Sequence, residues 1–193
     1  MRILVLYAHP VETSFCAALH DRAVAALRDA GHSVDDCDLY AEDFEPRLSR
    51  AERLGYHDTA TNRIAVAGDV DRLTAADGLV LVFPVWNFGF PAILKGYFDR
   101  VFLPGVSFVM RDGLVRPNLM NIRNLTAVAT YGGTRFRAVL AGDPPRRIVT
   151  RVLRGIAPRA RVRYLALYDM NRADTARRSA FLDSVEATLG AVS

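Results

Sequence analysis

An unbroken apolar run at residues 79–83, Leu-Val-Leu-Val-Phe, constrains the fold of this chain more than any other feature. A strand without polar residues must be covered on both faces, as a central strand of a parallel sheet is. Pro84 ends the run, because proline cannot donate to a sheet ladder. A helix is predicted to begin at Pro91, where the missing N–H costs nothing. Apolar residues then recur at helical spacing: Ile93, Leu94, Tyr97 and Val101.

The same alternation of apolar strands and amphipathic helices continues along the chain. It predicts a single domain over residues 1–193, without repeats or linkers. Five parallel strands with intervening helices predict a three-layer, doubly wound α/β sheet in the flavodoxin-like order 2-1-3-4-5. The predicted strands are 3–8, 34–39, 79–83, 125–130 and 161–168. The predicted helices are 15–30, 49–56, 70–76, 91–102, 148–156 and 173–189, with a loop or small hairpin at 106–117 and a loop around 142–145.

Composition excludes several classes of protein. The net charge is +4, carried almost wholly by arginine, since Lys95 is the only lysine. That charge is scattered rather than striped, so we expect no nucleic-acid partner, and a phosphate-bearing small ligand suits it better. No apolar run approaches membrane-spanning length, and the first residues lack a signal-peptide layout, which predicts a cytoplasmic protein with no membrane insertion. Cys16 and Cys37 match no metal-site spacing and are expected to be reduced thiols, so we predict no metal site.

Three loops are predicted to meet at the carboxyl edge of the sheet, where open α/β folds bind their ligands. The first, residues 9–14, leads into a helix whose N-cap is Thr13 or Ser14. Free N–H groups, the helix dipole and these hydroxyls favour a phosphate. Simple helix capping explains the same residues equally well.

The other two loops follow the third and fourth strands. Residues 84–90 contain Trp86, Asn87 and Phe88, and offer flat apolar surface beside a side-chain amide. Such a surface suits a planar heterocycle with polar edges. A small aromatic cluster that fixes the loop, or a dimer contact, would have the same composition. Gly132 and Gly133 follow the fourth strand and let the backbone approach a ligand closely, or form an ordinary turn. The convergence of the three loops favours a ligand site.

Several motifs resemble the NAD(P)H:quinone oxidoreductase family of flavodoxin-like flavoenzymes. The resemblance covers roughly the first two-thirds of the chain and residues 130–133, and residues 91–102 are its most specific part. These motifs are Ala8-His9-Pro10 with Thr13-Ser14-Phe15, Asp38-Leu39-Tyr40, Phe44-Glu45-Pro46 with Ser49-Arg50, Phe83-Pro84 with Phe88-Gly89, and Pro-Ala-Ile-Leu-Lys-Gly-Tyr-Phe-Asp-Arg-Val-Phe at 91–102.

The resemblance implies a tightly held flavin, FMN or FAD about equally, in a homodimer with active sites at the subunit interface. It places His9, Thr13, Ser14, Phe15 and Cys16 around the flavin phosphates. It places the isoalloxazine between two further groups of residues: Pro84, Val85, Trp86, Asn87 and Phe88, and Thr130, Tyr131, Gly132 and Gly133.

This sequence departs from the family pattern at three points. Cys16 stands where the family commonly has asparagine. Trp86-Asn87-Phe88 is more similar to the related FMN azoreductases than to quinone reductases. The Tyr and His that mammalian members place over the flavin are missing after Gly133. We therefore predict that protons come from solvent or from Tyr131, the candidate catalytic residue, and from none of the histidines.

The resulting hypothesis is an NAD(P)H-dependent flavin oxidoreductase that reduces quinones or similar acceptors by two electrons. Both substrates would use one flavin face, which predicts ping-pong kinetics. Two alternatives remain open: a regulatory flavoprotein subunit of a potassium-efflux system, and an electron-carrier flavodoxin. The basic net charge disfavours the carrier, since flavodoxins are typically acidic. Arg135 and Arg137 are candidates for a 2′-phosphate contact or form a solvated basic loop.

Overall fold

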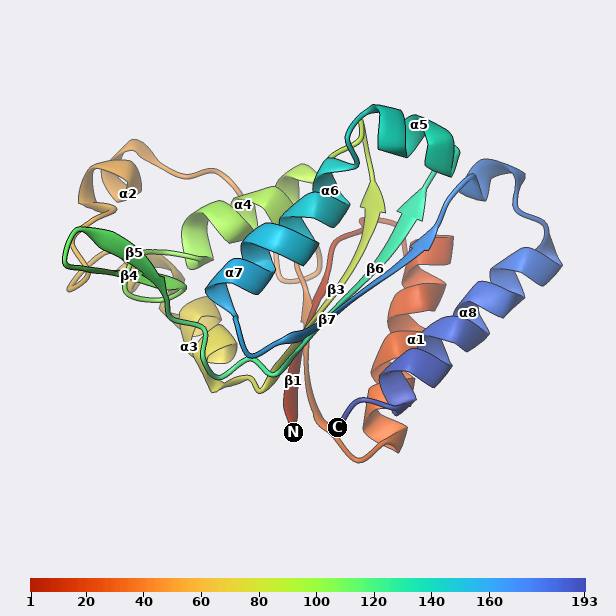
Figure 1. Cartoon of the computed structure of the whole chain (residues 1–193), viewed down its shortest axis with the longest axis horizontal. Helices are drawn as coiled ribbons and strands as arrows, with labels where there is room; N and C mark the ends of the chain where they lie inside the picture. Colours follow the sequence, from red (N-terminus) through yellow and green to blue (C-terminus); the bar gives the residue numbers. More distant parts are fainter.

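A five-stranded parallel sheet in the order β2-β1-β3-β6-β7 forms the centre of the molecule. The computed structural model describes all residues from 1 to 193. The order confirms the prediction, and Figure 1 shows the carboxyl ends of β3, β6 and β7 meeting at one edge. The strands of this sheet are β1 (Arg2–Tyr7), β2 (Ser33–Asp38), β3 (Gly78–Val85), β6 (Asn124–Tyr131) and β7 (Arg161–Leu167).

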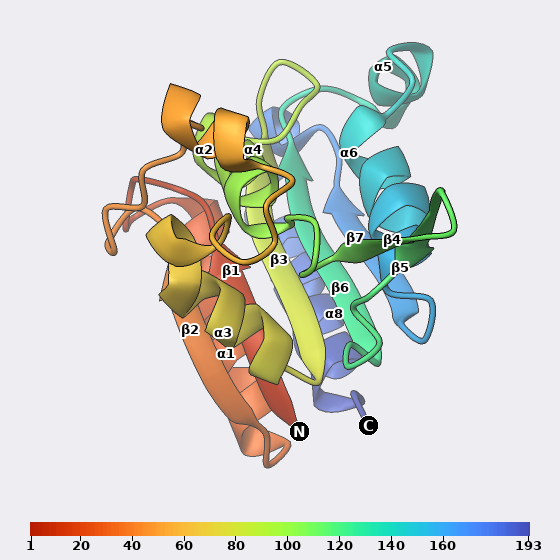
Figure 2. The same cartoon turned by 90° about the vertical axis from the view of Figure 1, so that its left-hand side faces the viewer.

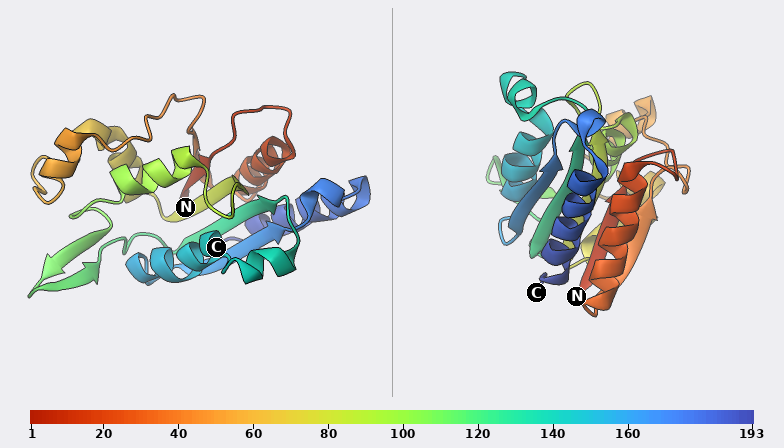
Figure 3. Two further views of the ribbon diagram at one scale, coloured as in Figure 1. Left: turned by 90° about the horizontal axis from the view of Figure 1, so that it is seen from above. Right: turned by 90° about the vertical axis from the view of Figure 1, so that its right-hand side faces the viewer.

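Helices cover both faces of the sheet, which is what two apolar faces require. On one face α1 (Phe15–Asp29) and α8 (Thr175–Gly190) lie side by side, as the right-hand view of Figure 3 shows. The other face carries α3, α4 and the helix that runs through α6 and α7 (Figures 1 and 2). These elements are α3 (Ala67–Ala75), α4 (Ala92–Val101), α6 (Pro144–Arg147), a π-helical stretch (Ile148–Leu153) and α7 (Arg154–Ile156).

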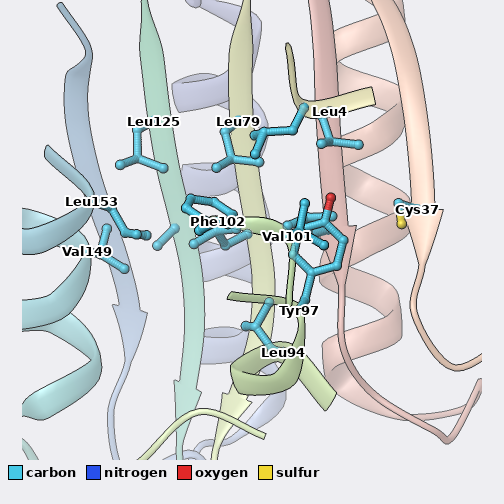
Figure 4. Packing of buried hydrophobic residues seen from close by; sticks show 14 of the residues in the cluster. Leu4, Cys37, Leu79, Leu94, Tyr97, Val101, Phe102, Leu125, Val149 and Leu153 are labelled. Carbon is cyan, nitrogen blue, oxygen red and sulfur yellow. The ribbon is translucent and has the colours of Figure 1, made fainter. Parts of the chain in front are cut away.

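Each face of the sheet has its own apolar core. Residues of α4 and of the strands form the larger one, and Figure 4 shows Tyr97 and Phe102 packed among Leu79 and Leu125. The smaller core joins α1 and α8 to the opposite face. In β3 every residue from Gly78 to Pro84 is buried. The unbroken apolar run therefore confirms a central, doubly covered strand.

Three local predictions need correction. The strand does not stop at Pro84 but pairs with β6 through Val85. The carbonyl of Val82 accepts from Ala8 on the β1 side. Pro84 faces the same side, so its missing N–H ends the pairing with β1, while the pairing with β6 continues on the other side. Pro91 is the cap residue of α4 rather than its first helical residue.

The segment after β6 holds the third correction. Residues 135–140, expected to be loop, form α5 (Arg135–Leu140), and the following helix begins at Pro144 rather than at residue 148. Proline at a first helical position is common, so Pro144-Pro145 was the available signal. Helix α2 (Arg50–Gly55) and the hairpin strands β4 (Phe108–Arg111) and β5 (Leu114–Pro117) agree with expectation. Two short 3₁₀ turns, at Ile64–Val66 and Met170–Arg172, were not predicted.

Candidate functional site

The loop between β1 and α1 ends in a helix start with unused donors. Ser14 is the N-cap, as one of the two predicted alternatives, and its Oγ accepts from the N–H of Ala17 at 3.1 Å. The N–H groups of Phe15 and Cys16 have no acceptor within the protein. Two free donors at the positive end of a 15-residue helix can bind an anion.

The other predicted phosphate-loop residues differ in exposure. Thr13 is exposed and Phe15 half-buried, so both border the loop surface. The side chain of Cys16 is 3% exposed and belongs to the core under α1, so only its backbone faces the loop. Burial raises the pKa of the Cys16 thiol to about 12. His9 is half-buried, and burial lowers its pKa. Its Nδ1 accepts from the N–H of Val11 at 3.0 Å.

The loop after β3 is a tight turn that presents aromatic side chains. Trp86 and Gly89 exchange backbone hydrogen bonds of 3.2 and 2.8 Å. Between them, Asn87 and Phe88 have φ of 49° and 59°. The left-handed region is unusual for phenylalanine and costs of order 1–2 kcal/mol. The turn leaves the side chains of Trp86 and Phe88 about two-fifths exposed, at 41% and 42%.

The loop after β6 is tied to the β7–α8 connection. The N–H of Asp169 donates to the carbonyl of Gly133 at 2.7 Å. A Cβ on Gly132 would lie 3.2 Å from Nδ2 of Asn171, so this glycine accommodates the neighbouring loop as well as any ligand. Thr134 then caps α5 by accepting from the N–H of Arg137.

The second and third loops share one cavity of about 210 Å³. Its lining combines aromatic, amide and glycine residues from the two predicted segments with Ala138 of α5. The first loop reaches this cluster through His9, whose ring centroid lies 5.8 Å from that of Trp86. His9 itself lines a separate cavity of about 400 Å³ toward the end of β2. The shared cavity is lined by Val85, Asn87, Phe88, Tyr131, Gly132, Gly133, Thr134 and Ala138.

Two predicted site residues lie beneath this cavity rather than in it. Pro84 and Thr130 are buried and sit opposite each other in the paired strands β3 and β6. Their part is to position the residues that follow them. The second and third loops therefore meet in one cavity, and the first loop approaches them through the ring pair of His9 and Trp86.

Tyr131, the predicted catalytic residue, belongs to a buried polar network that the sequence did not reveal. Its hydroxyl donates to Oδ1 of Asp143 at 2.6 Å and lies 2.7 Å from the hydroxyl of Tyr164. Tyr168 donates to Oδ2 of the same carboxylate at 2.9 Å. Burial, with these neighbours, raises the pKa of Tyr131 well above its usual value.

A family model described as a flavodoxin-like fold matches residues 1–189. The chain belongs to that family. The predicted fold class and the predicted family resemblance are both confirmed by this match and by the relatives below.

Among curated proteins, NAD(P)H dehydrogenase (quinone) 1 of Rattus norvegicus is 32% identical over 147 residues. The match covers 68% of this chain and 54% of the rat protein. Across the curated relatives compared, the matched part covers 45% to 68% of the relative's length.

Two solved structures illustrate the shared fold. The NAD(P)H:quinone oxidoreductase of Methanothermobacter marburgensis is 23% identical, with a TM-score of 0.87 and coverage of 100% and 99% of the two chains. An FMN-dependent NADH-azoreductase of Bacillus anthracis, solved in complex with FMN, is 14% identical, with a TM-score of 0.78 and 97% coverage of both chains. At these identities the likeness shows the fold alone.

No helix in the structure is both long enough and apolar enough to span a membrane.

Proposed function

We propose that this protein is an NAD(P)H-dependent flavin oxidoreductase that reduces quinones or similar acceptors by two electrons. The observation that carries the proposal is the cavity shared by the Trp86–Gly89 turn and the Tyr131–Thr134 loop. The loop before the helix start with two free N–H donors approaches this turn, with the ring of His9 5.8 Å from that of Trp86. The name of the rat relative supports the nicotinamide and quinone substrates, and the name of the azoreductase structure supports a flavin.

The residues present fit a flavin. Ser14 and the N–H groups of Phe15 and Cys16 would hold a phosphate. Trp86 and Phe88 offer aromatic faces for stacking, and Gly132 and Gly133 allow backbone contact with polar ring edges. When bound, flavin supplies hydride transfer. FMN and FAD share the phosphate and the ring that these contacts address. We therefore predict one of the two, and extraction of the cofactor identifies which.

Of the two proton sources predicted, the geometry favours solvent. The hydroxyl of Tyr131 is buried and already donates to Asp143, and its raised pKa makes it a weak acid. Since Trp86 and Phe88 are exposed, the aromatic side of the turn is open to water. We propose that Tyr131 holds the loop in place and that the acceptor takes its proton from water.

A homodimer, which the family resemblance implies, remains part of the proposal. The aromatic residues Tyr97 and Phe102 are only 0% and 8% exposed and belong to the core. A groove of about 380 Å³, which Phe102 helps to line, is almost wholly apolar. Apolar surface of this kind is typical of subunit contacts. Its lining includes Phe90, Phe98, Phe108, Ile148 and Val152.

The deciding experiment uses the purified full chain. We expect a yellow protein that releases one flavin per chain on denaturation and oxidises NAD(P)H in the presence of a quinone, with parallel double-reciprocal lines. Intersecting lines would contradict the ping-pong order. Failure to retain or take up either FMN or FAD would contradict the proposal as a whole. Light scattering at micromolar concentration tests the dimer separately.

A further inference from the structure

An arginine-lined cavity of about 250 Å³ adjoins the shared cavity along helix α5. Neighbouring residues of α5 belong to the two cavities: Ala138 lines the first and Val139 the second. The remaining lining comes from the turn before α6 and from the helix that follows, namely Gly142, Asp143, Arg146, Arg147, Thr150 and Arg151.

The three guanidinium groups of this cavity have no acidic partner. None of Arg146, Arg147 and Arg151 forms an ion pair within the chain. Arg146 packs over the ring of Tyr164 at 5.1 Å, and Nη1 of Arg147 lies 3.7 Å from where a Cβ on Gly142 would stand. Arg147 is therefore folded back over the turn toward the cavity.

The single carboxylate in the lining offsets only one of the three positive charges and forms no ion pair with these arginines. Both oxygens of Asp143 already accept hydrogen bonds, from Tyr131 at 2.6 Å and from Tyr168 at 2.9 Å. Three guanidiniums against one carboxylate leave two positive charges. A phosphate monoester carries about 1.5 to 2 negative charges at neutral pH, and the planar guanidinium binds phosphate oxygens in pairs.

Six of the seven lining residues are charged, polar or glycine, and Val139 is the one apolar side chain. Such a lining suits a charged group rather than an apolar ring. We propose that this cavity binds a phosphate monoester dianion, through Arg147 and Arg151 above all. Two sources share that chemistry: the 2′-phosphate of NADPH, which rests on the function proposed above, and a separate phosphorylated small molecule.

Calorimetry on the full chain tests the binding site without flavin or turnover. The probes are inorganic phosphate, adenosine 2′-monophosphate and, as a matched ligand without phosphate, adenosine. We expect the first two to bind and adenosine not to bind. Arg147→Gln and Arg151→Gln should each weaken binding about tenfold, because each removes a charge-assisted contact. Both side chains are exposed, so the variants should fold. The control is Arg154→Gln, an exposed arginine of the same helix outside the cavity.

Equal binding by the three variants, or no binding by the wild type, would overturn the proposal. Kinetics then separate the sources of the phosphate. If the bound phosphate is the 2′-phosphate of NADPH, the variant that combines Arg147→Gln with Arg151→Gln raises KM for NADPH about tenfold or more and leaves KM for NADH unchanged. If the ratio of the two KM values does not change while phosphate binding is lost, the ligand is a separate phosphorylated molecule. A protein without any flavin activity would still give the calorimetric answer, so the two proposals can fail independently.

Discussion

The phenol of Tyr131 donates a 2.6 Å hydrogen bond to Oδ1 of Asp143, a carboxylate only 7% exposed. A buried carboxylate is costly unless hydrogen bonds replace its water. Here the second donor is Tyr168, at the end of β7. The hydrogen bond between Tyr131 and Asp143 therefore joins the end of β6 to the turn before α6. Because Gly132 and Gly133 lie between these anchored residues, the network holds the glycine loop of the candidate site.

Replacing Asp143 by alanine should destabilise the fold by about 2–4 kcal/mol, because two buried hydroxyls lose their acceptor. Tyr131→Phe removes one donor and should cost only about 1 kcal/mol. Urea unfolding measures both. Asp71→Ala is the control, since Asp71 is exposed and its carboxylate makes no hydrogen bond or ion pair, so a change within about 0.5 kcal/mol is expected. A loss below about 1 kcal/mol for Asp143→Ala would show that the network does not hold the loop.

The aromatic turn makes a prediction about flavin retention. Phe88→Ala should weaken flavin binding about tenfold or more, because a stacked aromatic contact contributes roughly 1 kcal/mol beyond its buried area. Phe136→Ala is the matched control, since Phe136 is 75% exposed on α5 and lines neither cavity. Fluorescence titration of the apo-protein with FMN and with FAD gives both affinities. Equal losses of flavin affinity in the two variants would show that the aromatic turn does not contact the flavin.

Local and near-local patterns explain why so much of the fold was predictable. The apolar run of residues 79–83 is buried on both faces because a central strand has no polar side, so its neighbours had to be covered strands and helices. Spacing in residues 92–101 determines which side of α4 is buried. Ser14 was one of two candidate caps, and choosing between them needed the hydrogen bond to Ala17.

The missed parts of the site depend on contacts between distant residues. Tyr131 and Tyr164 are 33 residues apart, and their hydroxyls meet because β6 and β7 are neighbouring strands, with Tyr164 paired to Ala127. Asn171 lies in the connection after β7, against Gly132 in the loop after β6. Helix α5 has only six residues. Phe136, Val139 and Leu140 follow helical spacing but are exposed, and a run this short cannot be told from a loop by periodicity.

The contribution of Ser14 to flavin binding can be measured apart from its contribution as a helix cap. Ser14→Ala and Ser49→Ala should each lower stability by about 1 kcal/mol, because each hydroxyl accepts from a backbone N–H at a helix start. Only Ser14→Ala should also weaken flavin binding, since Ser49 caps α2, outside both loops of the shared cavity. Urea unfolding and flavin titration on the same two variants supply the comparison. Unchanged flavin affinity in Ser14→Ala would contradict the phosphate role of this loop.

Burial of Cys16 predicts how stability changes at alkaline pH. Its pKa rises from 9.0 to about 12 in the folded protein because burial disfavours the thiolate. Above about pH 9 the unfolded chain releases this proton while the folded chain keeps it. Proton loss then favours the unfolded state, so the free energy of unfolding falls as pH rises, by up to about 1.4 kcal/mol per pH unit for this thiol.

Cys16→Ala should flatten that dependence, because the variant has no thiol to titrate at this position. The measurement is guanidinium unfolding of both proteins, with reductant, between about pH 8 and 11. Loss of the sulfur lowers stability by a similar amount at every pH, so the slope and not the midpoint is the readout. Cys37 is present in both proteins, and its own raised pKa, also caused by burial, cancels in the comparison. Parallel curves for the two proteins would mean that the Cys16 thiol ionises as readily in the folded protein as in the unfolded chain.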